Sequence, residues 1–448
     1  MKKYLYLVYI HTVLCTFVAC GDPAEDAQAG ADNAGTEAVT SDAPPVSFQE
    51  FLLDWYADYD QGQGTDYLRN EGTLEEDLRF PLDGGMVNFD RWSDVAYGPH
   101  GERTTMDIYL PAGVEAAPVV VFMHGGGFGS KDKSEITTTS RAPVVGRYLR
   151  EGFAVASINY RFKRKVDCEL NPEVCTTRVE PEWDCAGGPD ATGCRLDLIY
   201  RDGARAIQYL RYRSEALNLD PDRIGAWGSS AGSQIVAWIG LMPDLAMPGH
   251  ADPVLRESTR LQAIGHRNSQ VTGASFLWPD YISFERDDSS CDAISVWEEL
   301  AVLNGETGYN ESLQLEMVDV NDSERALHQH AQDLIRVVHF FDAMDAEDPP
   351  FITTAPARDL SCEVLAEAGE VANAAEATVD EINYFQGKML HHPRMSEPLY
   401  DRCVEQGLPV CEIITDFEDS YSGIPVDDAN AAYRSDEDWL RQFMIETL

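Results

Sequence analysis

Basic residues are scarce in this chain of 448 amino acids. Lys and Arg together number 34 against 77 Asp and Glu, which gives a formal net charge of −43, and only seven residues are lysine. A nucleic-acid partner requires a basic surface that neutralises phosphates, so this composition argues against such a partner. We expect the acidic excess to form a solvated shell that keeps the protein in solution.

Long apolar runs are also absent after residue 20. Before it, Lys2 and Lys3 precede the apolar stretch Tyr4 to Val18, which is short for a membrane span and typical of a secretory signal. The stretch ends in Val-Ala-Cys-Gly, which resembles the lipobox of bacterial lipoproteins. That resemblance implies cleavage after residue 19 and lipidation of Cys20, and Gly21 favours the outer membrane. We therefore expect an exported protein, lipid-anchored to a bacterial membrane and facing periplasm or exterior, with plain secretion as the alternative.

The ten cysteines lack the close spacing of a zinc site, so we expect no bound metal. Cys15 and Cys20 belong to the N-terminal segment, which leaves eight. An even number in an exported chain indicates disulfides, although the sequence does not fix their connectivity. Pairing the cysteines that lie close together gives the expected bonds Cys168–Cys175, Cys185–Cys194, Cys403–Cys411 and, from the remaining two, Cys291–Cys362.

Composition and pattern divide the chain into four parts. Residues 1–19 form the signal peptide, and residues 20–46, with almost no large apolar side chain, predict a disordered tether. Residues 47–86 carry aromatic side chains at helical spacing and predict a helical segment that packs on the main domain or caps it. We expect the main domain to span residues 87–448. Inserts in it are expected near residues 162–195, 270–322 and 360–388.

Apolar runs in the main domain alternate with segments of helical periodicity. The runs Val119 to Met123 and Phe153 to Asn159 predict buried strands, and Asp197 to Leu217 carries apolar residues at helical spacing. In two earlier segments, Asp94 to Gly98 and Thr105 to Pro111, apolar and polar residues alternate, which predicts a pair of antiparallel strands. Strands that alternate with helices in this way indicate an α/β fold, with a mostly parallel central sheet and helices on both faces.

A tight turn is expected around Ser230. The apolar run Ile224 to Trp227 enters Gly-Ser-Ser-Ala-Gly, and a helix-like segment follows, which is the context of a nucleophile elbow. Because the turn is tight, Gly228 and Gly232, two residues either side of Ser230, must lack a Cβ atom. Ser230 would then present its Oγ at a helix N-terminus, whose dipole favours a developing oxyanion.

A second motif follows the strand that ends at Met123. It reads His124-Gly125-Gly126-Gly127, and a strand running into His-Gly-Gly-Gly is typical of the oxyanion-hole loop of esterases and lipases. Only glycine lets a backbone present its N–H groups so close to a substrate oxygen. The two motifs in this order, each after a strand, predict an α/β-hydrolase fold.

Four stretches then carry a family resemblance: YGPHGERTTMDIYLP, VVVFMHGGGFGS, VASINYRF and DPDRIGAWGSSAG. Over residues 90–245, apart from the first insert, they resemble the hormone-sensitive-lipase-like and bacterial feruloyl-esterase-like carboxylesterases. The resemblance implies hydrolysis of carboxylic esters through an acyl-serine at Ser230, without a cofactor. By motif match, the oxyanion donors are the N–H groups of Gly126, Gly127 and Ala231, and His124 has a structural hydrogen-bonding role.

The chain departs from this family where a catalytic histidine is expected. Asp-Pro-Pro-Phe at residues 348–351 resembles the family's strand before the acid, and Asp359 falls where the acid should lie. No histidine follows the last strand-like segment, Val410 to Thr415, and the final histidine of the chain is His392. One hypothesis is that His391 or His392 supplies the base. The acids that could orient it are Asp359, Asp416 and Asp419, and His266 is a less favoured base.

Two functions therefore stay open. The first is a serine carboxylesterase acting outside the cytoplasm on small or medium esters, because no apolar run suggests the lid of a lipase. The second is a catalytically impaired homologue that serves as a surface binding protein, which the missing histidine motivates. The basic run Arg161 to Lys165 at the first insert predicts a solvated patch, with recognition of an acidic substrate group as the alternative. Nothing in the composition indicates an oligomeric state.

Overall fold

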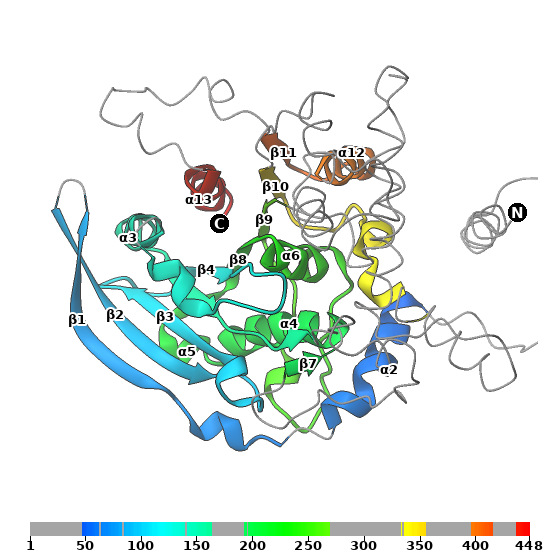
Figure 1. The fold of residues 1–448 in the computed structure, drawn as a ribbon, viewed down its shortest axis with the longest axis horizontal. Helices are drawn as coiled ribbons and strands as arrows, with labels where there is room; N and C mark the ends of the chain where they lie inside the picture. The colour runs from blue at the N-terminus through cyan, green and yellow to red at the C-terminus, as the bar shows by residue number, and fades with distance from the viewer. Residues whose placement is uncertain are drawn as a thin grey trace, which may run out of the picture. The chain divides into compact units, whose positions relative to one another are not determined.

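A mixed sheet of nine strands forms the centre of the computed structural model (Figure 1). In chain order its strands are β1 (Thr73–Leu82), β2 (Gly85–Ala96), β3 (Thr105–Pro111), β4 (Ala117–Met123), β5 (Ala154–Ile158), β8 (Leu219–Ser229), β9 (Ala263–Arg267), β10 (Phe351–Thr354) and β11 (Cys411–Ile414). The structure describes residues 47–61, 64–82, 85–138, 141–163, 192–194, 196–268, 333, 336–354, 396–414 and 436–448.

The strands lie in the order β1-β2-β3-β5-β4-β8-β9-β10-β11. The first three neighbouring pairs are antiparallel, and the remaining five pairs are parallel. The carboxyl ends of all six parallel strands therefore meet at one edge of the sheet, where ligands bind in open α/β sheets. Strand β3 begins at this same edge, because Met106 pairs with Ile158 at the end of β5.

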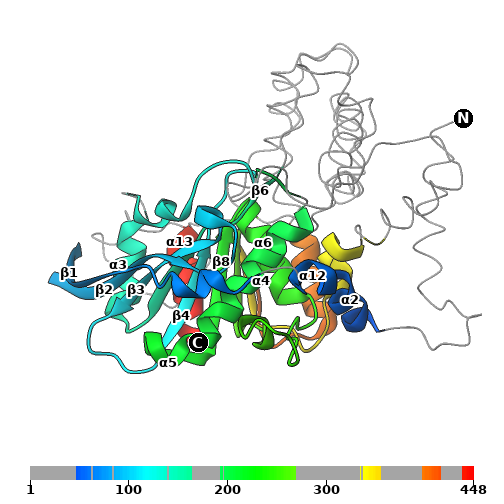
Figure 2. The same cartoon turned by 90° about the horizontal axis from the view of Figure 1, so that it is seen from below.

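Helices cover both faces of this sheet (Figure 2). Buried side chains of α3 (Ala142–Arg150) and α13 (Asp436–Thr447) share one apolar cluster. The other face packs against α4 (Leu196–Tyr212), α6 (Ala231–Leu241) and α12 (Glu397–Gln406). The predicted α/β fold, with a mostly parallel central sheet and helices on both faces, is confirmed.

Short elements complete the described fold. The 3-10 helices are η1 (Asp66–Arg69), η2 (Gly101–Thr104), η3 (Lys133–Thr137), η5 (Val254–Arg256) and η7 (Phe340–Ala343). The short helix α5 (Ser214–Leu217) follows α4, and β6 (Phe162–Lys163) pairs in parallel with β7 (Thr192–Cys194). No helix in the described part of the chain is both long and apolar enough to cross a membrane.

The N-terminal part of the fold differs from the expectation. Helix α2 (Phe48–Gln61) lies in the segment expected to be helical, and its Leu52 and Tyr56 are buried in the main core. The sheet, however, begins at Thr73 rather than near residue 87. Phe80 and Leu82 of this strand lie against Gly146 of α3, whereas most of its positions are exposed.

One expected disulfide is confirmed: Cys403 of α12 bonds to Cys411 of β11. The other three expected disulfides involve side chains outside the described residues. The signal peptide, Cys20, the tether and the inserts near 270–322 and 360–388 also lie outside them, so these expectations stay predictions.

Arg161, the first residue of the basic run, is buried rather than solvated. Arg161 is 1% exposed and follows the carboxyl end of β5. Its Nε and Nη2 donate to the two carboxylate oxygens of Asp202 on α4 at 2.8 and 2.6 Å, and its N–H donates to the same carboxylate at 3.0 Å. The expectation was therefore wrong for Arg161, because a buried carboxylate distant in sequence binds it.

This pair makes a stability prediction. Asp202→Asn leaves the Arg161 guanidinium buried without its counter-ion, so we expect the free energy of unfolding to fall by about 3 to 5 kcal/mol, measured by urea denaturation. Asp220→Asn is the matched control, since Asp220 binds the half-exposed Arg223 and should cost less than about 1 kcal/mol. Equal losses in the two variants would contradict the prediction.

Candidate active site

Ser230 lies in the turn between β8 and α6. Its backbone has φ 54° and ψ −120°, a conformation that residues with a Cβ atom rarely adopt. Hydrogen bonds hold the turn: the Ser230 N–H donates to the Arg267 carbonyl of β9 at 2.8 Å. The Ser233 hydroxyl donates to the Ser230 carbonyl at 2.7 Å. The turn therefore places Ser230 at the edge where the parallel strands end.

The glycines on either side of Ser230 allow a close approach between backbones. A Cβ on Gly228 would collide with the Gly232 carbonyl, and a Cβ on Gly232 would collide with the carbonyls of Met123 and His124. Because backbone atoms cannot move aside as a flexible side chain can, both positions require glycine. This contact joins α6 to the end of β4.

The His-Gly-Gly-Gly loop leaves β4 and lies directly against this turn. A Cβ on Gly125 would come within 2.8 Å of the Ser229 carbonyl oxygen and 3.4 Å of the Ser230 Cβ. Gly126 and Gly127 have φ of 104° and 60°, a region that favours glycine. The N–H of Ala231, in the first turn of α6, has no acceptor within that helix. The structure thus brings Gly125 and Ser230 together at the carboxyl edge of the sheet.

His124 fills a structural position under this loop. Its ring stacks on Tyr160 with centroids 4.2 Å apart, and its carbonyl accepts the Tyr160 hydroxyl at 2.6 Å. Its Nδ1 lies 2.7 Å from the Gly125 carbonyl oxygen, so Nδ1 carries the proton and donates. Burial lowers the pKa of His124 to about 4, which keeps the ring neutral at neutral pH.

His266 lies on β9, one residue before Arg267. It is fully buried, its ring is 5.4 Å from that of Phe351, and among the described residues neither ring nitrogen has a hydrogen-bond partner. Burial lowers its pKa to about 3. A general base works best with a pKa near the working pH, so this lowered pKa makes His266 poorly suited to that role.

The other candidates for base and acid lie outside the described residues. These are His391, His392, Asp359, Asp416 and Asp419. The polar network around Lys133, which follows the oxyanion loop, was not foreseen from the sequence. The available signal was composition, because Lys131 and Lys133 are two of only seven lysines and both come directly after the glycine motif.

The contact at Gly232 makes a prediction. Gly232→Ala forces a methyl group into the Met123 carbonyl, so we expect the free energy of unfolding to fall by about 3 kcal/mol or more in thermal or urea denaturation. Gly249→Ala is the control, because a Cβ there meets no atom within 4 Å. A Gly232 variant as stable as the control would show that the backbones are not in contact.

The buried histidines make a pH prediction. Histidine titrates near pH 6.5 when unfolded, whereas folding lowers the pKa of His124 to about 4 and of His266 to about 3, mainly by burial. The unfolded state binds more protons in this window, so the unfolding free energy should fall as pH falls below 6.5. Burial also lowers the pKa of His100 to about 4, which adds to this trend, and raises the pKa of Asp348 to about 7, which opposes it.

His266→Leu isolates one of these groups. Between pH 6 and 4, urea denaturation should show a slope of unfolding free energy against pH that is smaller by about 1.4 kcal/mol per pH unit than in the wild type. An unchanged slope would mean that His266 is not buried in its neutral form.

Comparisons with known proteins agree with the esterase motifs over one part of the chain. The family model BD-FAE matches residues 106–170, a segment that holds the oxyanion loop but not Ser230. No curated protein matches the chain significantly.

Several solved esterase structures align with this chain. A truncated carbohydrate esterase from gut microbiota is 16% identical, with 76% of this chain and 89% of that chain covered and a TM-score of 0.40. Esterase 2 of Thermogutta terrifontis with bound butyrate is 15% identical, with coverage of 84% and 94% and a TM-score of 0.41. An acetyl ester-xyloside bifunctional hydrolase of Caldicellulosiruptor lactoaceticus is 15% identical, with coverage of 76% and 88% and a TM-score of 0.39. In sequence, the chain resembles the BD-FAE family from β3 to beyond β6, over residues 106–170.

Proposed function

We propose that this protein is a serine esterase that hydrolyses small or medium carboxylic esters. One observation carries the proposal: Ser230 occupies a strained turn between a parallel strand and a helix, and the His-Gly-Gly-Gly loop packs against that turn at Gly125. A serine and an oxyanion loop held together at the carboxyl edge of the sheet suit acyl transfer.

In the proposed reaction, the Ser230 hydroxyl passes its proton to a base while Oγ bonds to the ester carbonyl carbon. The carbonyl oxygen becomes an oxyanion, which the N–H groups of Gly126, Gly127 and Ala231 stabilise. The tetrahedral intermediate then collapses and breaks the bond between the acyl carbon and the alcohol oxygen. The alcohol leaves with the proton that the base had taken from Ser230. Water then attacks the acyl-Ser230 in the same way and releases the acid. No cofactor takes part in these steps.

We assign the base to His391 or His392, oriented by Asp359, Asp416 or Asp419. Chain geometry supports this assignment. Ser396 is the N-cap of α12, and its hydroxyl accepts a hydrogen bond from Thr353 at 3.0 Å, near the carboxyl end of β10. His392 precedes Ser396 by only four residues in the sequence, which supports a base that acts at this edge of the sheet.

We also propose that the enzyme is exported and anchored through lipidated Cys20. The Cys403–Cys411 disulfide supports export, since such bonds persist in oxidising compartments. The alternative function, a surface binding protein on a hydrolase fold, is favoured by one observation: no histidine follows residue 392, whereas the last described strand begins at Cys411.

Hydrolysis of p-nitrophenyl acetate and butyrate by the purified full chain tests the proposal. We expect Ser230→Ala to lower kcat by about 10⁴-fold or more, because the nucleophile is removed. One of His391→Ala and His392→Ala should cause a comparable loss and name the base. Ser229→Ala, the neighbouring serine, is the control and should stay within a few-fold of wild type.

A fluorophosphonate label, located by mass spectrometry, should modify Ser230 in the wild type and in no other serine. A wild type that hydrolyses both esters no faster than Ser230→Ala and takes up no label would leave the binding-protein alternative.

A further inference from the structure

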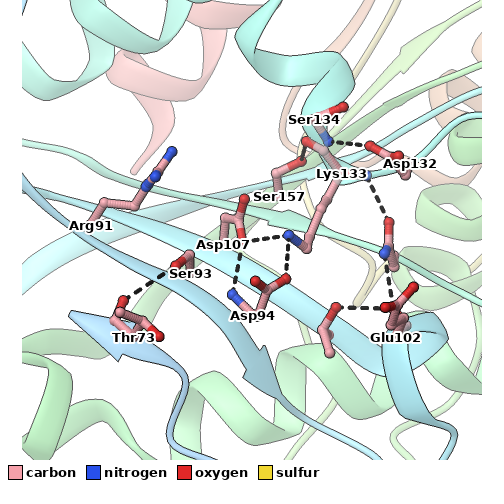
Figure 3. A network of polar contacts seen from close by, with 12 residues as sticks. Thr73, Arg91, Ser93, Asp94, Glu102, Asp107, Asp132, Lys133, Ser134 and Ser157 are labelled. Atoms are coloured by element: carbon pink, nitrogen blue, oxygen red, sulfur yellow. Dashed lines mark hydrogen bonds and ion pairs between the residues drawn. The ribbon is translucent and has the colours of Figure 1, made fainter. Parts of the chain in front are cut away.

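A buried lysine follows the oxyanion loop. Lys133 begins η3, and its side chain is only 13% exposed. Its Nζ donates to Asp107 of β3 at 2.6 Å and contacts Asp94 of β2 at 2.9 Å (Figure 3). Burial acts to lower the pKa of Lys133, but hydrogen bonds and the charges of the two carboxylates outweigh it and leave this pKa raised. The lysine is therefore charged throughout the neutral pH range.

The backbone of Lys133 is held as firmly as its side chain. Its N–H donates to the Asn159 side-chain oxygen at 2.7 Å, and its carbonyl accepts the Ser157 hydroxyl at 2.7 Å. Ser157 lies in β5 and Asn159 directly follows it. One residue thus binds three neighbouring strands or their ends, which fixes η3 relative to the sheet.

A bulge in β2 brings the second carboxylate to the lysine. The pairing of β2 with β3 shifts register between Trp92 and Val95, and Asp94 has φ 57°. The Asp94 N–H donates to the Asp107 carboxylate at 3.0 Å. β-Bulges next to active sites commonly re-aim a side chain, and strained backbone persists where its surroundings require it. Here the strained residue is the one that contacts Lys133.

The segment between Lys133 and the glycines is short and tightly folded. The Gly126 carbonyl accepts the Gly129 N–H at 3.1 Å and the Ser130 hydroxyl at 2.9 Å. Asp132 caps η3 by accepting the Ser134 N–H at 2.7 Å. A shift of Lys133 would therefore pass to Gly126 through a short segment in which Gly129 and Ser130 bond to the Gly126 carbonyl.

We propose that Lys133, held by Asp94 and Asp107, is a positioning residue that keeps the Gly126 and Gly127 N–H groups aimed at the substrate oxygen beside Ser230. Its kinetic consequence rests on the proposed esterase function. Donors of an oxyanion hole act through preorganisation, and a misplacement of about 1 Å can cost about a hundredfold in rate. Lys133 touches no reacting atom in this role and acts through the loop.

Lys131 provides a matched control. It lies two residues earlier, is 44% exposed and binds Glu135 within η3 rather than the sheet. Lys133→Met keeps the apolar stem and removes the charge, and Lys131→Met makes the same change outside the network. Asp107→Asn keeps the lysine and removes the negative charge of its partner.

With p-nitrophenyl acetate we expect Lys133→Met to lower kcat about tenfold to a hundredfold while KM changes less than about threefold. Lys131→Met should stay within about twofold of wild type. Fluorophosphonate titration should find the same fraction of reactive Ser230 in all variants. A lower kcat at an unchanged fraction then results from misplaced N–H donors and not from unfolded protein. Asp107→Asn should follow Lys133→Met, and the double variant should be little worse than either.

Amide hydrogen exchange gives a second readout that needs no activity. Peptides covering residues 124–132 should exchange about tenfold faster in Lys133→Met than in Lys131→Met, because the anchor of the loop is lost. If the wild type hydrolyses no ester, the proposed esterase function fails. The hydrogen-exchange comparison still tests whether Lys133 holds the loop, because it needs no activity. Equal exchange and equal kcat in the two lysine variants, or a fall only in the titrated fraction, would overturn it.

Discussion

The site depends on one close approach between backbones. Gly232, in the first turn of α6, lies against the carbonyls at the end of β4, where any Cβ would collide. This contact fixes the distance between the helix that follows Ser230 and the strand that leads into the glycine loop. Oxyanion stabilisation needs donors in place before the reaction, so in the proposed esterase reaction the absence of side chains at a few glycines serves catalysis as well as packing.

Much of the fold could be predicted because its signals are local. The buried strands 119–123 and 153–159 correspond to β4 and β5, and the glycine spacing around Ser230 marks the turn that the structure contains. Strand β1 could not be foreseen so easily. It lies at the sheet edge with most positions exposed, so burial imposes little pattern on its sequence, and the aromatic residues before it favoured a helix.

The polar contacts could not be predicted, because they join residues that only the tertiary fold brings together. Arg161 stands in a run of basic residues that suggests an exposed surface, yet its partner Asp202 comes from the following helix. The contact between Lys133 and Asp94 depends on a bulge, and a bulge changes which residues face each other without leaving a clear pattern. Composition could indicate only that lysines are rare and that two of them follow the glycine motif.

The scarcity of basic residues gains a physical explanation from these contacts. Arg161, Arg205 and Lys133 bind Asp202, Asp252 and Asp107 in buried or nearly buried pairs, and each pair joins segments distant in sequence. Such pairs add little net stability, since desolvation offsets most of the attraction, but breaking one leaves a charge buried. They therefore act mainly by excluding other arrangements of the segments that they join.

Two of these pairs lie near the carboxyl edge of the sheet. Arg161 fixes the end of β5 to α4, and Lys133 fixes η3 to β3. In a chain of net charge −43, surface carboxylates are abundant and interchangeable, whereas a buried cation with a specific partner is not. The Arg161 and Lys133 pairs thus join segments at the edge of the sheet where Ser230 lies.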